Sequence, residues 1–507
     1  MESENRTENR PEKTGWVQAV LPVRVPETLL EKQDGLAMPV KERKNSSEWK
    51  ERERRAIMQE QQSKSLFSNR DLIKLIIPLV IEQILAILVG MADTVMVSSA
   101  GESAVSAVSL VDNIGILLIN VFAALATGGA VIIGQYLGRE DRWQACRATD
   151  QLYIFVTAFS IVIMAALYLC KPFILYHVFG KIEEDVRSQA DIYLLITAAS
   201  IPFIAIYNSG AAVFRSMGNS KVSMLTSLIM NAVNIVGNAI LIYEFQMGVV
   251  GAAIPTLFSR IVAAVLITFL LYNQHLTVHL TKPFRPKPDL KLIQQILRLG
   301  IPNGLENSVF QLGKILVLNL VAVFGTTSIA ANAVANSLAA FQVLPGMAIG
   351  LAILTVIARC VGAGDYEQAR YYNRKLMLYA YGLVLASNVL FYFLLPLFLK
   401  LYQLSPETGA LARQVILLHG ICSVVIWPIS FTLPNTLRAA GDVKYTMIIS
   451  LLSMWIWRVG FSYVLGLWLN LGLVGIWAAM IIDWFVRGIF FLIRYKRGKW
   501  ETIRVIR

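Results

Sequence analysis

Long apolar runs alternate with short polar segments along most of the chain, and this pattern predicts its secondary structure. The first run, residues 71–97, is about 27 residues long, enough to cross a bilayer as a tilted helix. Eleven further runs follow, at about 105–137, 148–169, 192–214, 222–243, 249–272, 301–324, 329–361, 376–399, 411–436, 445–467 and 473–493. The pattern predicts an all-α integral membrane protein with twelve transmembrane helices.

The first six runs and the last six repeat one another. The pieces IPLVIEQ and IPNGLEN align at an offset of 224 residues, and the loop motifs GRED and GAGD align at the same offset. With one deletion, RSMGNSK also aligns with RAAGDVK. Chance similarity between apolar helices does not explain aligned loops. A duplicated six-helix unit predicts two pseudo-symmetric bundles in one orientation, a plan typical of transporters with a substrate site between the bundles. The aligned positions include Pro78/Pro302, Glu82/Glu306, Gly138/Gly362 and Arg215/Arg438.

Polar segments divide the chain into a tail, two bundles, a linker and a short end. The first segment carries many charges of both signs and has no apolar stretch for a signal peptide, so we expect a mostly disordered cytoplasmic tail. Loops rich in Lys and Arg are expected on the cytoplasmic side of the cell membrane, which places both termini there. The expected divisions are a tail at 1–65, a first bundle at 66–275, a basic linker at 276–290, a second bundle at 291–497 and a basic tail at 498–507.

Composition supports the membrane class. Hydrophobic residues make up 56% of the chain and charged residues only 16%, whereas a soluble protein carries about 25% charged residues. The formal charge of +13 collects in alternate loops, so it implies no nucleic-acid partner. The four cysteines show no CxxC spacing, which argues against a disulfide framework or a zinc site. His275 and His279 are spaced as a metal pair could be, but no carboxylate is near, and we expect an interfacial role.

Two carboxylates lie inside the first apolar run. Glu82 and Asp93 are eleven residues apart, which places them on nearly the same helix face, roughly 16 Å apart along the axis. An ionisable residue at the bilayer centre costs about 2.5–3.5 kcal/mol, so it usually faces a partner or a water-filled cavity. Two interpretations stay open at this point. The carboxylates could be paired with polar groups of neighbouring helices, or they could belong to a functional site.

Differences between the repeats separate the chemistry of the two halves. The first half carries intramembrane acids and amides, and the second half carries extra cations. The differing pairs are Asp93/Val317, Asp112/Asn336, Gly90/Lys314, Asn234/Arg458 and Asn238/Ser462.

An amide stripe marks the fifth run. Asn231, Asn234 and Asn238 fall on one helix face, where their oxygens and a nearby carboxylate could coordinate Na⁺ or relay a proton. Interhelical hydrogen bonding, worth about 0.6 kcal/mol per pair, explains them equally well. Asn332 and Asn336 form a shorter stripe, which we interpret as a packing contact between helices.

Lys314 lies eight residues after Glu306, too far around the helix to pair with it. We expect its partner to be an acid on another helix, Asp93 or Asp112. Such a pair could be a proton switch, because a facing cation lowers a carboxylate pKa, or it could be a static ion pair. Arg260 and Asp483 are interpreted as helix-end or bundle-packing charges.

Five stretches together resemble the multidrug and toxic compound extrusion (MATE) family over about residues 66–497. They are PLVIEQILAILVGMADTVMV, FAALATGGAVIIGQYLGRED, FRSMGNSK, IPNGLEN and LRAAGDVK. The resemblance implies two six-helix lobes forming a V around a central cavity. It also implies export of small organic, often cationic, compounds driven by inward Na⁺ or H⁺, with rocking lobes and no further cofactor. We expect a monomer surrounded by membrane lipids.

The resemblance also implies roles for particular residues. Asp93 and Asn234 match an aspartate and an asparagine of the family's first-lobe cation site, whereas Asn238 stands where some members carry an acid. Glu306 matches a glutamate of one bacterial branch. With these matches, the expected cation-coupling residues are Asp93, Asn234, Asn238 and Asp112. The expected second-lobe or conformational residues are Glu82, Glu306, Lys314 and Asn336.

Other function classes fit less well. A flippase for a lipid-linked precursor would share the architecture, but it prefers a cavity lined by several cations, and Lys314 and Arg458 are few. A membrane-embedded enzyme would need a His, Ser or paired-acid constellation at catalytic spacing, which the sequence lacks. A nucleotide-driven pump would need a phosphate-binding loop, and GxxxxGK[ST] does not occur.

Overall fold

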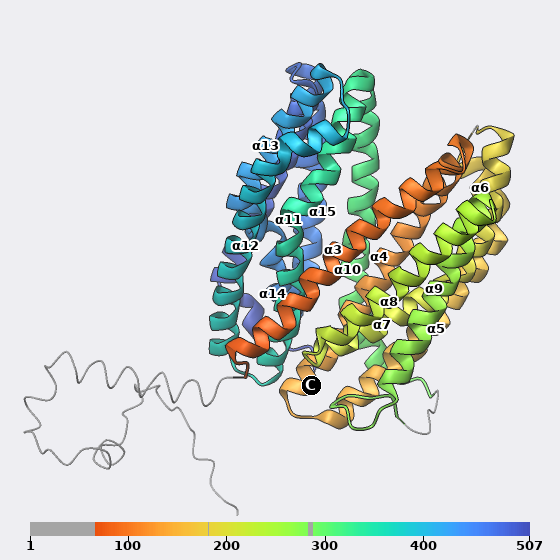
Figure 1. The fold of residues 1–507 in the computed structure, drawn as a ribbon. Coiled ribbons are helices and arrows are strands. Elements are labelled where there is room, and N and C mark those ends of the chain that lie inside the picture. Colours follow the sequence, from red (N-terminus) through yellow and green to blue (C-terminus); the bar gives the residue numbers. More distant parts are fainter. Residues whose placement is uncertain (1–65, 181, 282–286, 507) are drawn as a thin grey trace, which may run out of the picture. The chain divides into compact units, whose positions relative to one another are not determined.

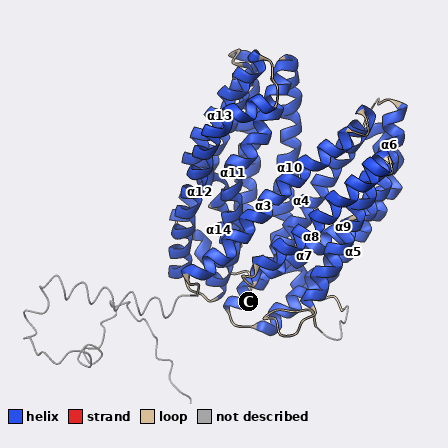
Figure 2. Ribbon diagram, in the orientation of Figure 1, coloured by secondary structure: helices blue, strands red, loops and turns tan. Residues whose placement is uncertain are grey.

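The computed structural model describes residues 66–180, 182–281 and 287–506. The predicted cytoplasmic tail at 1–65 lies outside the described residues. In the described part, every regular element is a helix (Figure 2). Eleven of these helices are long and apolar enough to span a membrane, and one bent pair makes a twelfth span. The prediction of twelve spans in an all-α membrane protein is confirmed.

The first bundle runs from α3 to α9 (Figure 1). Ser68 and Asp71 form a reciprocal cap at the start of α3, as a capping box does. The fourth span bends by 43° between α6 and α7, next to Pro202, because proline cannot donate the hydrogen bond that would continue the helix. The helices are α3 (Asn69–Ser98), α4 (Glu102–Gly138), α5 (Arg142–Phe173), α6 (Glu184–Ala199), α7 (Ile201–Ser216), α8 (Ser220–Ala239) and α9 (Gly248–Leu271), with π-helical extensions η2 (Ile174–Val178) and η3 (Ile240–Glu244).

The second bundle repeats this plan from α10 to α17. Its helices are α10 (Leu290–Ala322), α11 (Gly325–Gly362), α12 (Tyr366–Leu401), α13 (Pro406–Trp427), α14 (Pro434–Ala439), α15 (Val443–Ser453), α16 (Phe461–Tyr463) and α17 (Gly472–Lys496). Three π-helical segments, η4 (Pro428–Thr432), η5 (Met454–Gly460) and η6 (Val464–Trp468), continue α13, α15 and α16, and a short 3₁₀ turn, η7 (Lys499–Thr502), follows α17.

One π-helical segment explains an irregularity of the repeat. The offset between the halves is 223 residues at Lys221/Lys444 and returns to 224 at Gly248/Gly472. Segments η3 and η6 correspond at 224, whereas η5 has no counterpart in the described part of the first bundle. A π-helical turn closes over one residue more than an α-helical turn. The second bundle therefore accommodates its extra residue in η5.

The two bundles meet at one end through a pair of equivalent glycines. A Cβ atom on Gly138 would lie 2.0 Å from the carbonyl oxygen of Arg359, and one on Gly362 would lie 2.0 Å from that of Gln135. Only glycine allows two helix backbones to approach this closely. Because Gly138 and Gly362 are equivalent in the repeat, α4 and α11 contact each other reciprocally.

Hydrogen bonds at the same end follow the same symmetry. Gln135 Nε2 of α4 donates to the carbonyl of Ala439 at the end of α14 (2.8 Å). Arg359 Nε of α11 donates to the carbonyl of Ser216 at the end of α7 (3.2 Å). We call these glycine contacts and hydrogen bonds, formed by Gly138, Gly362, Gln135 and Arg359, the bundle contact.

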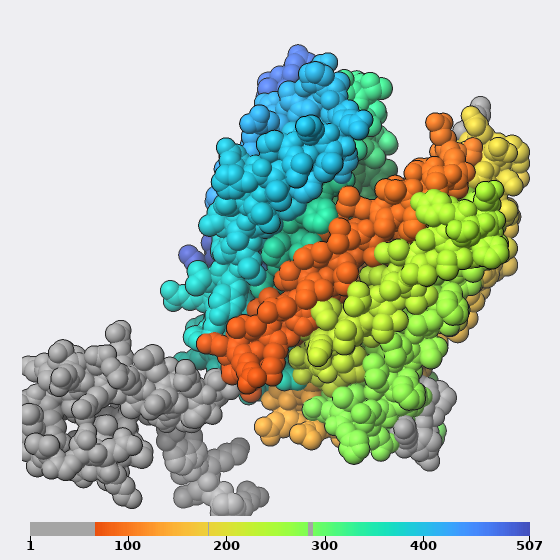
Figure 3. Space-filling model, viewed as in Figure 1, coloured from red at the N-terminus to blue at the C-terminus, as the bar shows by residue number. Residues whose placement is uncertain are grey.

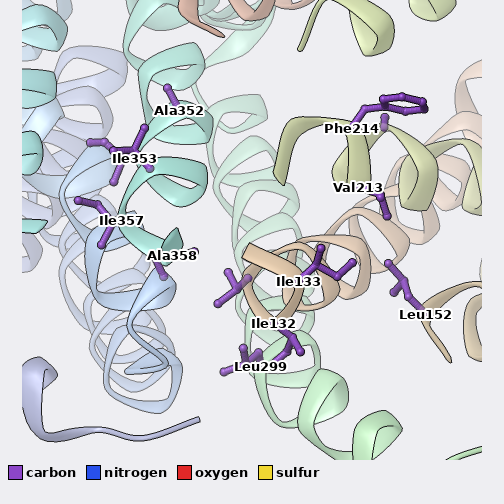
Figure 4. Close-up of a cluster of buried hydrophobic side chains, with 14 of the residues drawn as sticks. Ile132, Ile133, Leu152, Val213, Phe214, Leu299, Ala352, Ile353, Ile357 and Ala358 are labelled. Atoms are coloured by element: carbon purple, nitrogen blue, oxygen red, sulfur yellow. The ribbon is translucent and has the colours of Figure 1, made fainter. Parts of the chain in front are cut away.

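A shared core surrounds the bundle contact. Side chains from α4, α10 and α11 belong to one buried cluster there, including Ile132, Leu299 and Ile357 (Figure 4). Two other buried clusters each belong to a single bundle. In Figure 3 the surface of residues 66–506 is hollowed between the two bundles away from the contact. The bundles are therefore joined at one end and separate toward the other.

Candidate functional site

A chain of polar groups links three helices of the first bundle. Asn238 Nδ2 on α8 donates to Asp93 Oδ1 on α3 (2.8 Å) and lies 3.5 Å from Asn234 Oδ1. Asn234 Nδ2 donates in turn to Thr256 Oγ1 on α9 (3.2 Å). Asn234 and Asn238 share a face because they are four residues apart on a helix. The structure thus brings together three of the four residues expected at a cation site, and it adds Thr256.

This first-bundle network presents an oxygen with no partner. Asn238 is only 1% exposed, and its Oδ1 accepts no hydrogen bond within the described residues. Leaving a buried polar atom unsatisfied costs about 1–3 kcal/mol. Asp93 and Asn234 add a carboxylate and a second amide oxygen to the network, and hard cations prefer oxygen ligands of these kinds. In the described part of the chain, no three His, Cys, Asp or Glu residues gather as ligands for a transition metal.

Asp112, the fourth expected residue, lies beside this network. It accepts a hydrogen bond from the Tyr193 hydroxyl (3.2 Å), and it interacts electrostatically with Asp93 and with Arg260. Arg260 also donates to Ser200 Oγ (2.7 Å). Asp112 and Arg260 line a cavity of about 30 Å³.

The interpretation of Arg260 as a helix-end charge is wrong, whereas a packing charge inside the first bundle fits its hydrogen bond to Ser200. Arg260 lies in the middle of α9 and interacts with both Asp93 and Asp112. A guanidinium near two carboxylates offsets part of their mutual repulsion. Sequence reasoning missed this because the three residues come from three different helices.

Both repeat-related glutamates form buried ion pairs. Glu82 pairs with Arg215 (3.3 Å) and accepts a hydrogen bond from Ser223 Oγ (2.8 Å). Glu306 pairs with Arg438 (2.7 Å). The arginines come from the loop motifs that reveal the repeat, more than 130 residues further along the chain, so sequence spacing gave no signal of the pairing. Both Glu82 and Asp93 meet residues of α8, as their shared helix face predicts.

The prediction that Lys314 pairs with Asp93 or Asp112 is wrong. Asp93 and Asp112 have partners of their own in the first bundle, and Lys314 forms no ion pair among the described residues. Its Nζ instead lies 5.4 Å from the ring centre of Phe310. Lys314, Asn336 and Arg458 line a second cavity of about 180 Å³ inside the second bundle. The turn of α10 directs Lys314 toward its own bundle, because Phe310, one helical turn earlier, already faces Arg458 there.

Of the two interpretations of Asp483, the structure contradicts the helix-end charge and agrees with the bundle-packing charge. Asp483 is fully buried, and it accepts two hydrogen bonds from Arg487 Nη2 (both 2.9 Å) and one from Ser453 Oγ (2.5 Å). Asp483 and Arg487 are four residues apart, a spacing at which helical side chains meet. That spacing was readable from the sequence and would have predicted the pair.

Comparison with known proteins identifies the family. A family model described as MatE matches residues 78–240 and 302–493, one range within each bundle. An "Uncharacterized transporter YisQ" of Bacillus subtilis is 27% identical, over 83% of this chain and 93% of its own. A "Probable multidrug resistance protein NorM" of Thermotoga maritima is 28% identical, over 86% of this chain and 94% of its own.

Solved structures share the fold. An outward-facing multidrug resistance MATE family transporter of the MOP superfamily superposes with a TM-score of 0.76 at 21% identity, over 86% of this chain and 96% of its own. The duplicated six-helix plan, the loop motifs and these matches agree. The chain belongs to the MatE family, the multidrug and toxic compound extrusion transporters.

Proposed function

We propose that the protein is a secondary active antiporter that exports organic, often cationic, compounds in exchange for inward Na⁺ or H⁺. The observation that carries this proposal is the network of Asp93, Asn234, Asn238 and Thr256, with its unpartnered buried oxygen at Asn238. A carboxylate inside a membrane bundle is costly and is typical of ion or proton pathways. Binding of a cation to Asp93 competes with the hydrogen bond that joins α3 to α8 and so couples ion occupancy to helix packing.

The fold supports alternating access by rocking of the two bundles. We place the bundle contact and both termini on the cytoplasmic side of the cell membrane, following the basic loops. The hollow between the bundles then faces outward. Inward opening requires α4 and α11 to separate and the Gln135 and Arg359 hydrogen bonds to break. In this proposal residues 66–275 and 291–497 move as two lobes of a monomer embedded in membrane lipids.

The linker between the lobes is attached to the first of them. Thr281 Oγ1 donates to Asp150 (2.6 Å), and Arg147 pairs with Asp289 (2.6 Å). Val278 is fully buried. The described part of the linker therefore moves with the first lobe, and we place the hinge near the start of α10.

Dye export from proteoliposomes tests this function. Wild-type protein and Asp93→Asn are compared under a Na⁺ gradient and, separately, under a H⁺ gradient. We expect the wild type to export ethidium under one of the two gradients, which identifies the coupling ion. The initial rate of export by Asp93→Asn should be at least tenfold lower. The neutral amide keeps the size of the carboxylate but removes the charge that binds the ion.

Asp185→Asn is the matched control, because Asp185 is exposed in the first turn of α6 and the same charge is removed from the same bundle. It should export at the wild-type rate. Normal export by Asp93→Asn would contradict coupling through this network. Absence of dye export by every protein under both gradients would contradict drug antiport and favour the alternative function, a flippase for a lipid-linked precursor.

A further inference from the structure

The cavity of about 180 Å³ in the second bundle is lined by residues of α10, α11, η5 and α17. Lys314, Arg458, Asn332 and Asn336 supply its polar groups, and Trp477 supplies an aromatic wall. Lys314 is fourteen residues beyond Gly300, where α10 packs against α4, a distance of about 21 Å along the helix. The cavity therefore lies in the part of the second bundle where the two bundles have separated.

The cavity holds cationic groups whose charge is not neutralised. Arg458 is only 9% exposed, and its Nε has no hydrogen-bond partner within the described residues. Neither Arg458 nor Lys314 forms an ion pair with any described residue. Both cations flank the Phe310 ring, at 5.2 Å and 5.4 Å from its centre. Burying a guanidinium without an anion is unfavourable, so this arrangement favours an anionic occupant.

The carboxylate that interacts with Arg458 is already neutralised. Asp483 interacts with Arg458 electrostatically, but its oxygens are occupied by Arg487 and Ser453. The charges of Asp483 and Arg487 therefore neutralise each other, and the positive charges of Lys314 and Arg458 remain without a counter-charge beside the cavity.

The repeat shows that this cavity is the counterpart of the first-bundle network with the polarity reversed. Four of its lining residues stand where the network or its neighbourhood has polar or acidic groups, at the offset of 224. At these positions two carboxylates, an amide and a hydroxyl are replaced by two aliphatic groups, an amide and a guanidinium. The pairs are Asp93/Val317, Asp112/Asn336, Asn234/Arg458 and Thr256/Met480.

The inserted turn of the second bundle positions the guanidinium. Arg458 belongs to η5, the π-helical segment that has no counterpart in the described part of the first bundle. A π-helical turn rotates the following side chains relative to an uninterrupted α-helix, and such turns are frequent at functional sites. The same segment places Met454 against Gly313 of α10, where a Cβ would lie 2.2 Å from the Met454 side chain. Close packing of η5 on α10 brings Arg458 and Lys314 to the same ring.

We propose that this cavity binds an anionic group, a carboxylate or a phosphate, of an amphiphilic substrate. The inference deepens the proposed transport function and rests on it. A cavity needs only about 10–15 Å³ to hold one water molecule, so this one has room for such a group with its remaining waters. Lys314 and Arg458 make charge-assisted hydrogen bonds to the anion, Asn336 lies beside them, and the apolar part of the substrate packs on Trp477 and Met480. Such a substrate is anionic or zwitterionic, in contrast to an organic cation.

Equilibrium binding of carboxyfluorescein to the purified full-length protein in a neutral detergent tests the proposal. Fluorescence anisotropy measures the affinity of the wild type, Lys314→Gln, Arg458→Gln and Lys314→Arg. We expect each glutamine variant to bind about tenfold or more weakly, which is the loss of about 1.4 kcal/mol of charge-assisted interaction. Lys314→Arg should retain most of the affinity because the charge is kept.

Matched controls remove the same charges elsewhere in the second bundle. Lys400→Gln and Arg413→Gln change exposed residues of α12 and α13 that do not line the cavity, and they should bind carboxyfluorescein as the wild type does. Equal affinity in all variants and controls, or no binding by the wild type, would overturn the proposal. Ethidium export by the same variants in proteoliposomes is measured in parallel, so that loss of the anion site is distinguished from loss of transport.

Competition identifies the source of the anion. Displacement of carboxyfluorescein by inorganic phosphate supports a soluble anionic substrate. Displacement by phosphatidylglycerol added to the detergent micelles, but not by inorganic phosphate, supports a lipid headgroup. Both outcomes require Arg458, so competition that persists unchanged in Arg458→Gln would contradict the site.

Discussion

At the scale of the residue, the molecule distinguishes paired from unpaired charges. Glu82 and Glu306 are buried and each meets an arginine of its own bundle. Glu82 has a second partner in Ser223, whereas Oε2 of Glu306 has no hydrogen-bond partner within the described residues. Asp93 and Arg458, in contrast, have no ion pair in the described part of the chain. The unpaired charges are the ones on which the two proposals of a cation site and an anion site rest.

The Glu82–Arg215 pair makes a prediction about stability. Arg215→Met leaves a buried carboxylate without its cation, and breaking such a pair typically costs about 3–5 kcal/mol. We expect Arg215→Met and Glu82→Met each to lower the thermal unfolding midpoint strongly. The double variant should recover much of the loss, because two apolar side chains need no partner. Fluorescence-detected size-exclusion chromatography after heating measures the midpoints. Simple addition of the two single effects would show that the charges do not interact.

At the scale of the element, glycines and π-helical turns determine how helices approach one another. Gly138 and Gly362 allow α4 and α11 to touch, and η5 absorbs the extra residue of the second half. The bundle contact depends on the first feature, and the cationic cavity depends on the second.

Gly138→Ala should weaken the bundle contact. The new Cβ would lie 2.0 Å from the Arg359 carbonyl oxygen, so α4 and α11 must move apart. A cysteine at Ala358, whose Cβ faces Gly134 across the same interface, reports this movement in a background without the four native cysteines. We expect faster maleimide labelling of Ala358→Cys in the Gly138→Ala protein than in the reference.

Gly382→Ala is the control for this substitution. Gly382 lies in α12 with nothing within 4 Å of the Cβ position, so alanine should be neutral or stabilising there, in line with its higher helix propensity. Unchanged labelling in Gly138→Ala would show that the helices absorb the methyl group without separating, which would argue against the glycine contact as a requirement for closure.

At the scale of the whole described unit, the end of the chain ties the two bundles together. Trp500 is fully buried and stacks on Tyr495 of α17, with ring centres 5.6 Å apart. Glu501 forms two 2.7 Å hydrogen bonds with Arg370 of α12. Arg139, at the end of α4, donates to the carbonyl of Ile506 (3.3 Å). The described part of the expected C-terminal tail is thus packed against both bundles.

Truncation after Gly498 should therefore destabilise the bundle contact. The deletion removes the buried Trp500, and loss of a buried tryptophan side chain costs about 3–5 kcal/mol. We expect a lower thermal unfolding midpoint and faster labelling of Ala358→Cys. A protein lacking only Arg507 is the control and should match the full chain. Equal midpoints for the two truncations would indicate that the segment packs without contributing to stability.

Most of the fold could be predicted from the sequence, because apolar length determines membrane spanning and a repeat determines pseudo-symmetry. The span pattern, the duplication and the shared face of Glu82 and Asp93 all follow from local periodicity. The amide face of Asn234 and Asn238 follows in the same way. These features depend only on residues close together in the sequence or on comparison of the chain with itself.

Only the tertiary structure decided which charges meet. Glu82 pairs with Arg215, 133 residues away. Arg260 lies close enough to Asp93 and Asp112 to interact with both electrostatically. Lys314 lies against the same ring as Arg458 and has no acidic partner among the described residues. Helix rotation and crossing select these partners, and they depend on packing across several spans, which single-helix periodicity does not contain. The sequence by itself thus determined a duplicated membrane bundle with acids in one half and cations in the other. The packing decided which of those charges are neutralised and which remain available.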